Sequence, residues 1–377
     1  MANDVVNKKK LRKIKIIVVV VLIIGFILYC CLCGKGKNPL EVATSIFHTL
    51  QGESQSETQS ESEVQANSQV NSQANSQSQS QQSGQNSQVI TNVDGEMQVH
   101  FIDVGQADAT LIIQNEKTML FDVATRSRGD DVAQYIKNLG INYVDVLVLS
   151  HPHDDHMGGA ADFLENMDVG IIYAPDFFEE NLTSGWYKNM LEQIDIIDAK
   201  RNEGVAESKQ TSILQFPKNE KGEFVKFNLG DAYVEFLAPF ENKYSDLNDY
   251  SICCKVTYGT VDIMFTGDAT KSVEEDLLNQ NTNLDVEIFQ AGHHGSDTSN
   301  SKAFIEAMSP EAIVISCGMK NKHNHPVKSV IEMFKNMKIP VYRTDEVGDI
   351  VMVTDGTTYS FDKEKGSYTS GEEHKGE

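Results

Sequence analysis

Side chains that can bind metal ions crowd into one short stretch of the sequence. Residues 151–156 read HPHDDH, directly after the apolar run VDVLVLS and just before a pair of glycines. Neutral imidazoles and carboxylates bind zinc well, and also iron and manganese. His151 and His153 lie two positions apart and face the same side of an extended turn, so together they can hold one ion. Asp155 and His156 lie beyond the bend and can face a second ion.

Four side chains do not complete two metal sites, so the remaining ligands must come from elsewhere in the chain. Asp268 ends the apolar segment DIMFTGD, where a carboxylate at the edge of a sheet can bridge two ions; an ordinary strand-end or helix-capping aspartate is the alternative. The segment QAGHHGSDTS supplies His293 and His294, the best source of a further imidazole. The segment NKHNHP offers His323 and His325. One of these two can orient a phosphate or a leaving group, and a plain surface position is the alternative for His323.

The apolar patterning predicts the strands and helices that must position these segments. MQVHFID, ATLIIQ and TMLFDVA read as a β-meander, and VDVLVLS as a buried strand. Residues 129–141 have helical spacing with a stop at Gly140. Further strands are expected in DAYVEFLAPF, SICCKVTYG and VDIMFTGD, and helices in SVEEDLLNQ, SKAFIEAM and PVKSVIEMFKNM. This order predicts an α/β domain of two similar halves, with two sheets packed face to face and helices outside.

The composition divides the chain into five segments. Residues 1–15 are basic, and residues 16–33 carry no charge over 18 positions, which is long enough to span a membrane. The basic cluster predicts a cytoplasmic N-terminus and an extracellular remainder. We expect an uncleaved signal anchor, with a cleaved signal peptide as the alternative. Residues 34–95 are expected to form a disordered linker, rich in Ser, Gln and Asn, before a folded domain at 96–363 and a polar, frayed tail at 364–377.

The charge of the expected domain bears on its partners. Residues 96–363 contain 22 Lys/Arg and 44 Asp/Glu, which gives a net charge of 22 − 44 = −22. A surface that acidic repels polyphosphate backbones at long range, which argues against non-specific binding of nucleic acid. The charge favours a small or wall-tethered ester over duplex DNA, although divalent metal ions would offset part of it locally.

Five motifs, in order, resemble the metallo-β-lactamase superfamily and its ComEC-type branch, the hydrolase domain of DNA-uptake competence proteins and its stand-alone, membrane-anchored relatives. They are FIDVGQADATLI, HPHDDHMGG, FTGD, GHHGS and HNHP, spread over nearly all of residues 96–362. The resemblance implies an αββα sandwich with a dinuclear metal centre at the sheet edges. It implies that Asp268 is the bridging carboxylate, and that His293 lies near the substrate. The implied metal ligands are His151, His153, Asp155, His156, Asp268 and His294.

The sequence departs from the superfamily pattern at one expected ligand. Much of the superfamily has a further ligand histidine in the middle of the domain, whereas no histidine occurs here from 157 to 292. The ComEC-type branch shares that lack and carries an NDxS stretch, here NDYS. Asn248 and Asp249 of this stretch are the candidates to fill the gap. Ala124 also stands where a glycine is more usual.

These features predict an extracellular, membrane-anchored hydrolase with two divalent ions, expected to be zinc, with manganese and iron as alternatives. A hydroxide between the ions is the expected nucleophile, oriented by Asp155 and Asp268. His293 or His325 is expected to donate to the reacting oxygen or the leaving group. The expected substrate is a phosphodiester of DNA or of a wall polymer, and a role in uptake would need DNA-uptake partners. The alternatives are a hydrolase of another ester or amide and a non-catalytic binding or sensing module.

Overall fold

The computed structural model describes residues 95–177, 184–206, 209–280 and 282–376. The predicted signal anchor at 16–33 and the linker at 34–94 lie outside these residues. Within the described part of the chain, no helix is long and apolar enough to cross a membrane.

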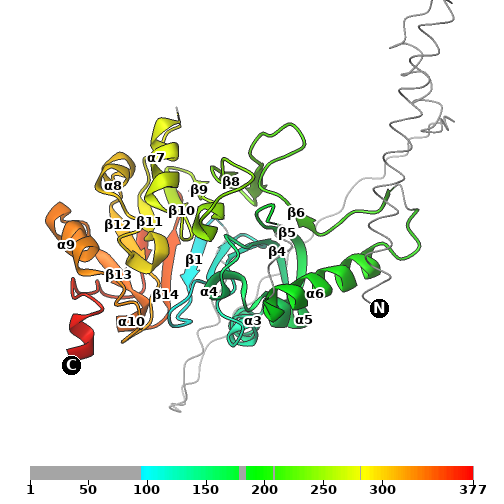
Figure 1. Cartoon of the computed structure of the whole chain (residues 1–377), viewed down its shortest axis with the longest axis horizontal. Helices are drawn as coiled ribbons and strands as arrows, with labels where there is room; N and C mark the ends of the chain where they lie inside the picture. Colours follow the sequence, from blue (N-terminus) through cyan, green and yellow to red (C-terminus); the bar gives the residue numbers. More distant parts are fainter. Residues whose placement is uncertain (1–94, 178–183, 207–208, 281, 377) are drawn as a thin grey trace, which may run out of the picture. The chain divides into compact units, whose positions relative to one another are not determined.

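Two sheets form the centre of the folded unit (Figure 1). The first sheet has the strand order β15 (Tyr359–Phe361), β14 (Ile350–Thr354), β1 (Met97–Phe101), β2 (Thr110–Gln114), β3 (Lys117–Phe121), β4 (Tyr143–Val148), β5 (Asp168–Tyr173) and β6 (Leu214–Gln215). The second has the order β13 (Val341–Arg343), β12 (Ala312–Ile315), β11 (Ile288–Gln290), β10 (Val261–Phe265), β9 (Cys254–Tyr258), β8 (Ala232–Phe236) and β7 (Lys226–Leu229).

Each sheet is antiparallel at one side and parallel at the other, as expected for two similar halves. In the first sheet the pairing becomes parallel from β3 through β6. In the second sheet it is parallel from β10 through β13. Parallel strands require crossover connections, and most of these connections contain the helices. The carboxyl ends of the parallel strands in each sheet meet at one edge, which is where α/β folds place ligands.

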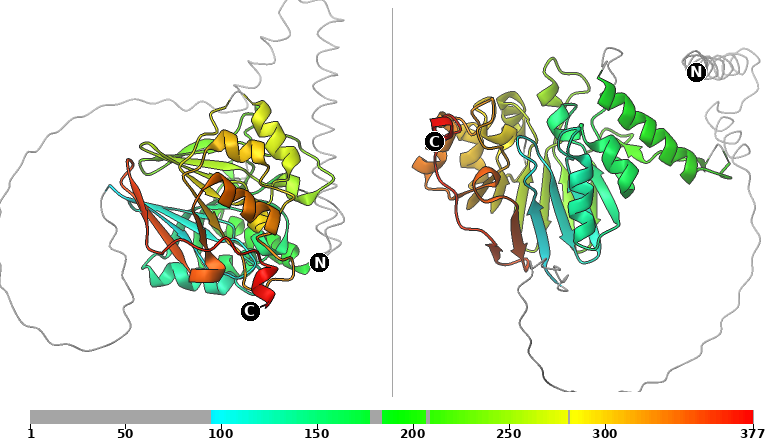
Figure 2. Two further views of the ribbon diagram at one scale, coloured as in Figure 1. Left: turned by 90° about the vertical axis from the view of Figure 1, so that its left-hand side faces the viewer. Right: turned by 90° about the horizontal axis from the view of Figure 1, so that it is seen from below.

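The helices cover the outer faces of the two sheets (Figure 2). Those against the first sheet are α3 (Gly129–Asn138), α5 (Ala160–Asn166) and α6 (Gly185–Arg201), and the short α4 (Asp154–Met157) precedes α5. Those against the second sheet are α7 (Lys271–Asn279), α8 (Lys302–Met308) and α9 (Lys328–Met337). The short elements are α10 (Thr344–Val347), η2 (Leu247–Tyr250), η3 (Gly292–Gly295) and η4 (Glu373–Gly376).

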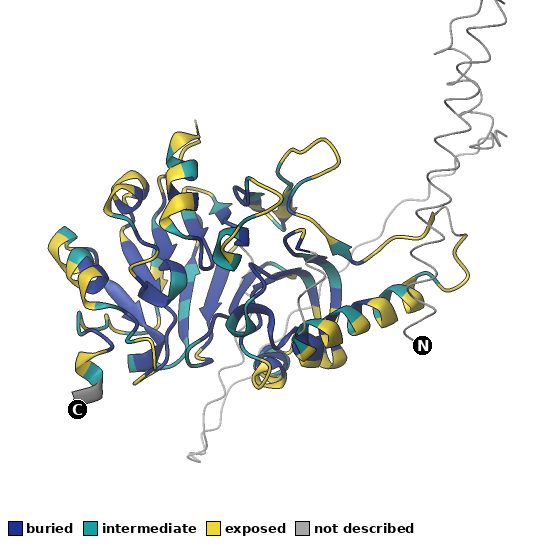
Figure 3. Cartoon of the chain, in the orientation of Figure 1, coloured by how far each residue is buried: buried dark blue, intermediate teal, exposed yellow. Residues whose placement is uncertain are grey.

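Three apolar layers hold this arrangement together. The central layer lies between the sheets, where the Phe121 and Phe265 rings stack with their centroids 5.3 Å apart. Two outer layers lie between each sheet and its helices. The central strands are therefore buried on both faces, whereas the edge strands β6, β7 and β15 are partly exposed and the helices expose their outer sides (Figure 3). The predicted α/β sandwich of two sheets with outer helices is confirmed.

A close approach between two glycines fixes the helix that follows the HPHDDH segment. A Cβ at Gly159 would lie 2.3 Å from the Val123 carbonyl oxygen and 2.9 Å from the Gly129 Cα. A Cβ at Gly129 would lie 2.1 Å from the Gly159 carbonyl oxygen. Only the absence of both side chains allows the start of α5 to lie against the start of α3. The HPHDDH segment is thereby held between a buried strand and a fixed helix.

The polar tail was expected to fray, and this expectation is wrong for the part that the structure describes. The Arg343 guanidinium is fully buried and pairs with Asp345 at 2.7 Å. It also donates to the carbonyl oxygens of Ser367 and Thr369 in the tail. The Tyr368 hydroxyl donates to the Ile339 carbonyl oxygen at 2.8 Å, and Ser370 is fully buried. A buried cation requires acceptors for all its donors, and the tail supplies two of them.

Candidate metal centre

The predicted site residues come together at the carboxyl ends of strands from both sheets. The HPHDDH segment follows β4 of the first sheet. Asp268 follows β10, and His293 and His294 lie in η3 directly after β11. His325 lies in the loop between β12 and α9. The face-to-face packing of the sheets therefore joins segments that are more than a hundred residues apart.

The first cluster consists of His151, His153 and Asp268, with one atom of each within 4.8 Å of the others. His151 Nε2 lies 3.0 Å from His153 Nδ1 and 3.7 Å from Asp268 Oδ2. Two ligands of one tetrahedral zinc ion, each bonded at about 2.0–2.1 Å, lie roughly 3.3 Å apart. The spacing of these three groups fits a shared ion.

The second cluster consists of Asp155, His156 and His294. His294 Nε2 lies 3.5 Å from Asp155 Oδ2, and His156 Nε2 lies 3.1 Å from Asp268 Oδ1. The two oxygens of Asp268 therefore face different clusters, Oδ1 the second and Oδ2 the first. A third group, Asp108, His156 and Asp268, overlaps the second cluster. This is the arrangement expected of a carboxylate placed between two ions.

Hydrogen bonds on the far side of three rings leave Nε2 directed at the clusters. His156 Nδ1 lies 2.8 Å from Asp122 Oδ2, and His294 Nδ1 lies 2.9 Å from the Ser316 carbonyl oxygen. Both partners accept, so the neutral forms of these two rings carry their hydrogen on Nδ1 and present an unprotonated Nε2. His151 Nδ1 lies 3.0 Å from Ser150 Oγ. Partners of this kind fix the tautomer and the ring plane of a metal-binding histidine.

Buried polar atoms without hydrogen-bond partners are a second sign that these residues fit a bound cation. His156 Nε2, His294 Nε2 and Asp268 Oδ1 are buried and make no hydrogen bond of good geometry. A buried polar atom left without a partner costs about 1–3 kcal/mol. Three such atoms, all from residues of the clusters, would each gain a partner from divalent ions.

The pKa shifts of His151, Asp268 and Asp155 favour the protonation states that bind metal. Burial, and then the neighbouring His156, lower the pKa of His151 well below its ordinary value, which keeps this imidazole neutral. Burial alone would raise the pKa of the Asp268 carboxyl, but the adjacent His156 and His151 outweigh it and lower that pKa. The same balance holds for Asp155, whose pKa is lowered by His294 and His156 against the effect of burial. Two imidazoles shift the other way: against the effect of burial, Asp268 and Asp122 raise the pKa of His156, and Asp108 and Asp155 raise that of His294, well above the ordinary value.

Three further predicted residues line the cavity beside the clusters, which has a volume of about 830 Å³. His293 Nε2 lies 3.3 Å from Asp268 Oδ2, and His293 Nδ1 lies 2.8 Å from Thr298 Oγ1. The His325 ring lies 5.4 Å from that of His293, and burial with the nearby His294 lowers the pKa of His325 to about 3. His323 is largely exposed at the rim. Neither His323 nor His325 belongs to a metal-binding group among the described residues.

The structure separates the two candidates for the missing ligand. Asp249 Oδ1 accepts a hydrogen bond from the Thr270 hydroxyl at 2.5 Å, and Asp249 does not line the cavity. Asn248 does line it, and its Oδ1 is buried without a hydrogen-bond partner. The amide oxygen of Asn248 is therefore the better placed of the two.

Sequence reasoning missed four residues that support the clusters: Gln106, Asp108, Asp122 and Ser150. Asp122 Oδ1 and Oδ2 accept from the Ser150 backbone N–H and hydroxyl, each at 2.7 Å. Burial raises the pKa of Asp122, although the neighbouring His156 opposes this. One signal was available, because Asp122 ends an apolar strand as Asp268 does. Ala124, where glycine was expected, has a left-handed φ of 58°, the conformation that glycine adopts most readily.

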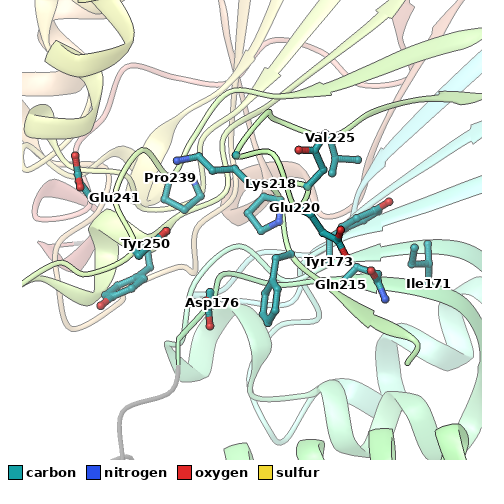
Figure 4. A pocket seen from close by; sticks show the side chains of 15 residues that line it. Ile171, Tyr173, Asp176, Gln215, Lys218, Glu220, Val225, Pro239, Glu241 and Tyr250 are labelled. Atoms are coloured by element: carbon teal, nitrogen blue, oxygen red, sulfur yellow. The ribbon is translucent and has the colours of Figure 1, made fainter. Parts of the chain in front are cut away.

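A second cavity, of about 670 Å³, lies among the segments after β5, β6 and β8 (Figure 4). Tyr173 and Tyr250 line it, together with the carboxylates of Asp176, Glu220 and Glu241. It shares no lining residue with the cavity beside the clusters and contains no histidine or cysteine. The chemistry predicted from the sequence therefore belongs to the cavity beside the clusters.

Comparison with known proteins agrees with the motifs. Residues 102–318 match the family model described as the metallo-beta-lactamase superfamily. The chain is 25% identical over 278 residues to ComE operon protein 3 of Bacillus subtilis, covering 68% of this chain and 33% of that protein. It is 29% identical over 259 residues to competence protein ComA of Neisseria gonorrhoeae, covering 68% and 32% respectively. The chain thus spans about a third of the length of these relatives.

Solved structures show weaker similarity. The metallo-beta-lactamase fold protein YhfI from Bacillus subtilis is 11% identical, with a TM-score of 0.42, covering 69% of this chain and 99% of that one. The diiron beta-hydroxylase CmlA from Streptomyces venezuelae is 13% identical, with a TM-score of 0.39, covering 67% and 52%. At these scores neither structure informs the function of the chain.

Proposed function

The chain belongs to the metallo-β-lactamase superfamily, with a domain of the ComEC type, and from that premise we propose that it is a dinuclear-metal phosphodiesterase. The observation that carries the proposal is the position of Asp268, whose two carboxylate oxygens face two separate His/Asp clusters. Zinc is the expected metal, because the donors are imidazoles and carboxylates. Manganese and iron accept the same donors and are the alternatives.

The residues of the chain would divide the work as follows. His151, His153 and Asp268 would hold one ion, with Asn248 as the candidate for a further ligand. Asp155, His156 and His294 would hold the second, with Asp268 between the two. Divalent ions in these positions supply an activated water at neutral pH and neutralise charge on the reacting oxygens. Asp155 would orient the attacking water, and His293 would donate a hydrogen bond to the substrate.

The walls of the cavity favour an anionic ester as substrate. One wall of the cavity carries the carboxylates of the clusters, whose negative charge bound cations would neutralise. Other lining residues bring N–H donors, namely Gln106, Asn321, Lys322, His323 and His325. Lys322 is exposed, with no ion pair among the described residues. A phosphodiester presents two non-bridging oxygens that share one negative charge, and both kinds of wall can bind them, whereas a neutral amide would leave the cation of Lys322 unused.

DNA and a phosphoester of a wall polymer are the two substrate candidates. One relative is named a competence protein, and this supports DNA. The net charge of −22 over residues 96–363 supports a small or wall-tethered ester, since duplex DNA would be repelled at long range. Turnover of DNA within uptake would need protein partners.

Metal analysis combined with a substrate panel tests this function. We expect the full-length protein in detergent to hold two divalent ions and to hydrolyse bis(p-nitrophenyl) phosphate. His151→Ala should lose one ion and lower the rate by about 10²-fold or more, because one metal cluster loses a ligand. His374→Ala is the matched control. It removes an imidazole of the tail that lies beside Glu346, and it should retain both ions and the full rate.

Two results of this experiment would contradict the proposal. Unchanged metal content and rate in His151→Ala would show that the site is elsewhere. A protein that holds two ions but hydrolyses neither the small diester nor DNA would be a binding or sensing module on the same fold, or a hydrolase of another ester or amide.

We also propose that residues 16–33 anchor the protein in the cell membrane in a single pass, with the N-terminus cytoplasmic and the hydrolase domain outside. The charge-free stretch and the basic residues before it support this topology. Protease added to intact cells is expected to cut within residues 51–95 and release the domain. A domain that is released only after lysis would contradict the outward orientation.

A further inference from the structure

The His325 ring has one hydrogen-bond partner in the described part of the chain, the side chain of Gln106. Gln106 Nε2 lies 3.3 Å from His325 Nδ1, although the two residues are 219 positions apart. His325 is 7% exposed and lines the cavity beside the metal clusters. Its ring lies 5.4 Å from the ring of His293 and 6.2 Å from that of His294. The contact therefore acts on a ring at the candidate reaction site.

The orientation of the Gln106 amide is fixed by a backbone donor. The Gly318 N–H donates to Gln106 Oε1 at 3.1 Å. A backbone N–H can only donate, so the oxygen of the amide must face Gly318 and its NH₂ group must face His325. Gly318 comes this close because it lacks a side chain, since a Cβ there would lie 2.7 Å from the Gln106 backbone nitrogen.

The amide orientation in turn settles the tautomer of His325. The Gln106 NH₂ group donates, so His325 Nδ1 must accept and carries no hydrogen. In a neutral imidazole the hydrogen is then on Nε2. The backbone of His325 is held as well, because Asn321 accepts from its N–H at 3.0 Å and donates to its carbonyl oxygen at 2.6 Å.

We propose that Gln106 is a positioning residue that holds His325 as a neutral imidazole with its hydrogen on Nε2, and that His325 donates this hydrogen bond to a phosphoryl oxygen of the substrate without transferring a proton. This inference rests on the proposed phosphodiesterase function and assigns a role within it. A neutral imidazole that gave up its Nε2 hydrogen would become an anion, which is strongly unfavourable near neutral pH. The proton for the leaving group therefore comes from water in the open cavity, and His325 stabilises charge only.

Gln106→Glu tests the proposal with almost no change of shape. One carboxylate oxygen still accepts from Gly318, but the other faces His325 Nδ1 and draws the single hydrogen of the neutral ring onto that atom and away from Nε2. We expect the kcat for bis(p-nitrophenyl) phosphate to fall by roughly 10²-fold, the effect of losing one preorganised donor, with KM and metal content little changed. Gln134→Glu makes the same charge change on the exposed face of α3 and should leave kcat unchanged.

The tautomer itself is read by ¹⁵N NMR of the full-length, zinc-loaded protein labelled in its histidine rings. The His325 signals are assigned by their absence in His325→Gln. We expect an unprotonated Nδ1 and a protonated Nε2 in the natural protein, and a protonated Nδ1 in Gln106→Glu. The opposite tautomer in the natural protein would overturn the inference. This readout needs no turnover, so it separates failure of the inference from failure of the proposed function.

A double substitution shows whether Gln106 acts through His325. His325→Gln keeps an N–H near the position of Nε2 and should retain part of the activity. Adding Gln106→Met to His325→Gln should lower kcat by less than about 3-fold, because the partner of Gln106 is already gone. A further loss as large as that of Gln106→Met alone would mean that Gln106 acts by another route, which would also overturn the inference.

Discussion

Asp268→Asn is expected to abolish two-metal binding and to lower phosphodiester hydrolysis by roughly 10³-fold or more. The amide retains the shape of the side chain and the hydrogen bond from the Asp268 backbone N–H to Ser251 Oγ. It removes the negative charge, however, and places an NH₂ group, which cannot bind a cation, toward one of the two clusters. Metal analysis of the purified variant should give no more than one ion per chain, and the rate is measured with bis(p-nitrophenyl) phosphate.

The same variant should fold, and thermal unfolding can show this. Without metal, the neighbouring His156 and His151 lower the pKa of the buried Asp268 carboxyl, so Asp268→Asn removes a stabilising charge and should lower the melting temperature of the metal-free protein while leaving one cooperative transition. Added zinc should raise the melting temperature of the natural protein and have a much smaller effect on the variant. Asp162→Asn, on the exposed side of α5, is the matched control. If Asp268→Asn kept both ions and its activity, Asp268 would not be the carboxylate that lies between the two ions.

Asp122→Asn is expected to lower metal affinity by about 10–100-fold, although Asp122 belongs to neither cluster. If the amide oxygen keeps the bond from the Ser150 N–H, the amide nitrogen faces His156 Nδ1. Two donors then face each other, and His156 must move its hydrogen to Nε2, the atom directed at the second cluster. Competition between the protein and a chromophoric zinc chelator measures the affinity.

Two further variants make this expectation specific. Ser150→Ala leaves the bond between Asp122 and His156 but removes the hydroxyl partner of both Asp122 and His151, so its metal affinity should fall through the first cluster. Asp131→Asn makes the same chemical change on the exposed face of α3 and should have no effect. If Asp131→Asn and Asp122→Asn weakened zinc binding equally, the tautomer of His156 would not explain the loss.

Local pattern was sufficient to predict most of the fold. The helix expected at 129–141 corresponds to α3, which ends at Asn138, and Gly140 follows with a left-handed φ of 82°. The helices expected in SVEEDLLNQ, SKAFIEAM and PVKSVIEMFKNM are α7, α8 and α9. The long α6 was not predicted. Its buried residues are Trp186, Met190 and Ile194, while Ile196 is exposed, so the apolar pattern has no clear face.

The candidate site, like the fold, could be predicted only in part from the sequence. Residues capable of binding metal are recognisable by type and spacing, and the structure brings His151, Asp268 and His294 to one sheet edge. The residues that aim them are ordinary in the sequence. Gln106 and Asp122 gain their importance from partners far along the chain, and no local pattern contains that information. The choice between Asn248 and Asp249 likewise depends on which side chain the η2 turn directs into the cavity.

The contacts between the tail and Arg343 show that the folded unit extends beyond Lys363, where the sequence pattern placed the end of the domain. By composition, the domain would be cut after Lys363, and the rest would be discarded as dispensable. Such a cut would strip the Ser367 and Thr369 carbonyl oxygens from a guanidinium that has no access to water. It would also remove Gly371, whose N–H donates to the Pro326 carbonyl oxygen at 2.9 Å. The last residues of the chain thus close over the loop that carries His325, and a recombinant fragment should retain them.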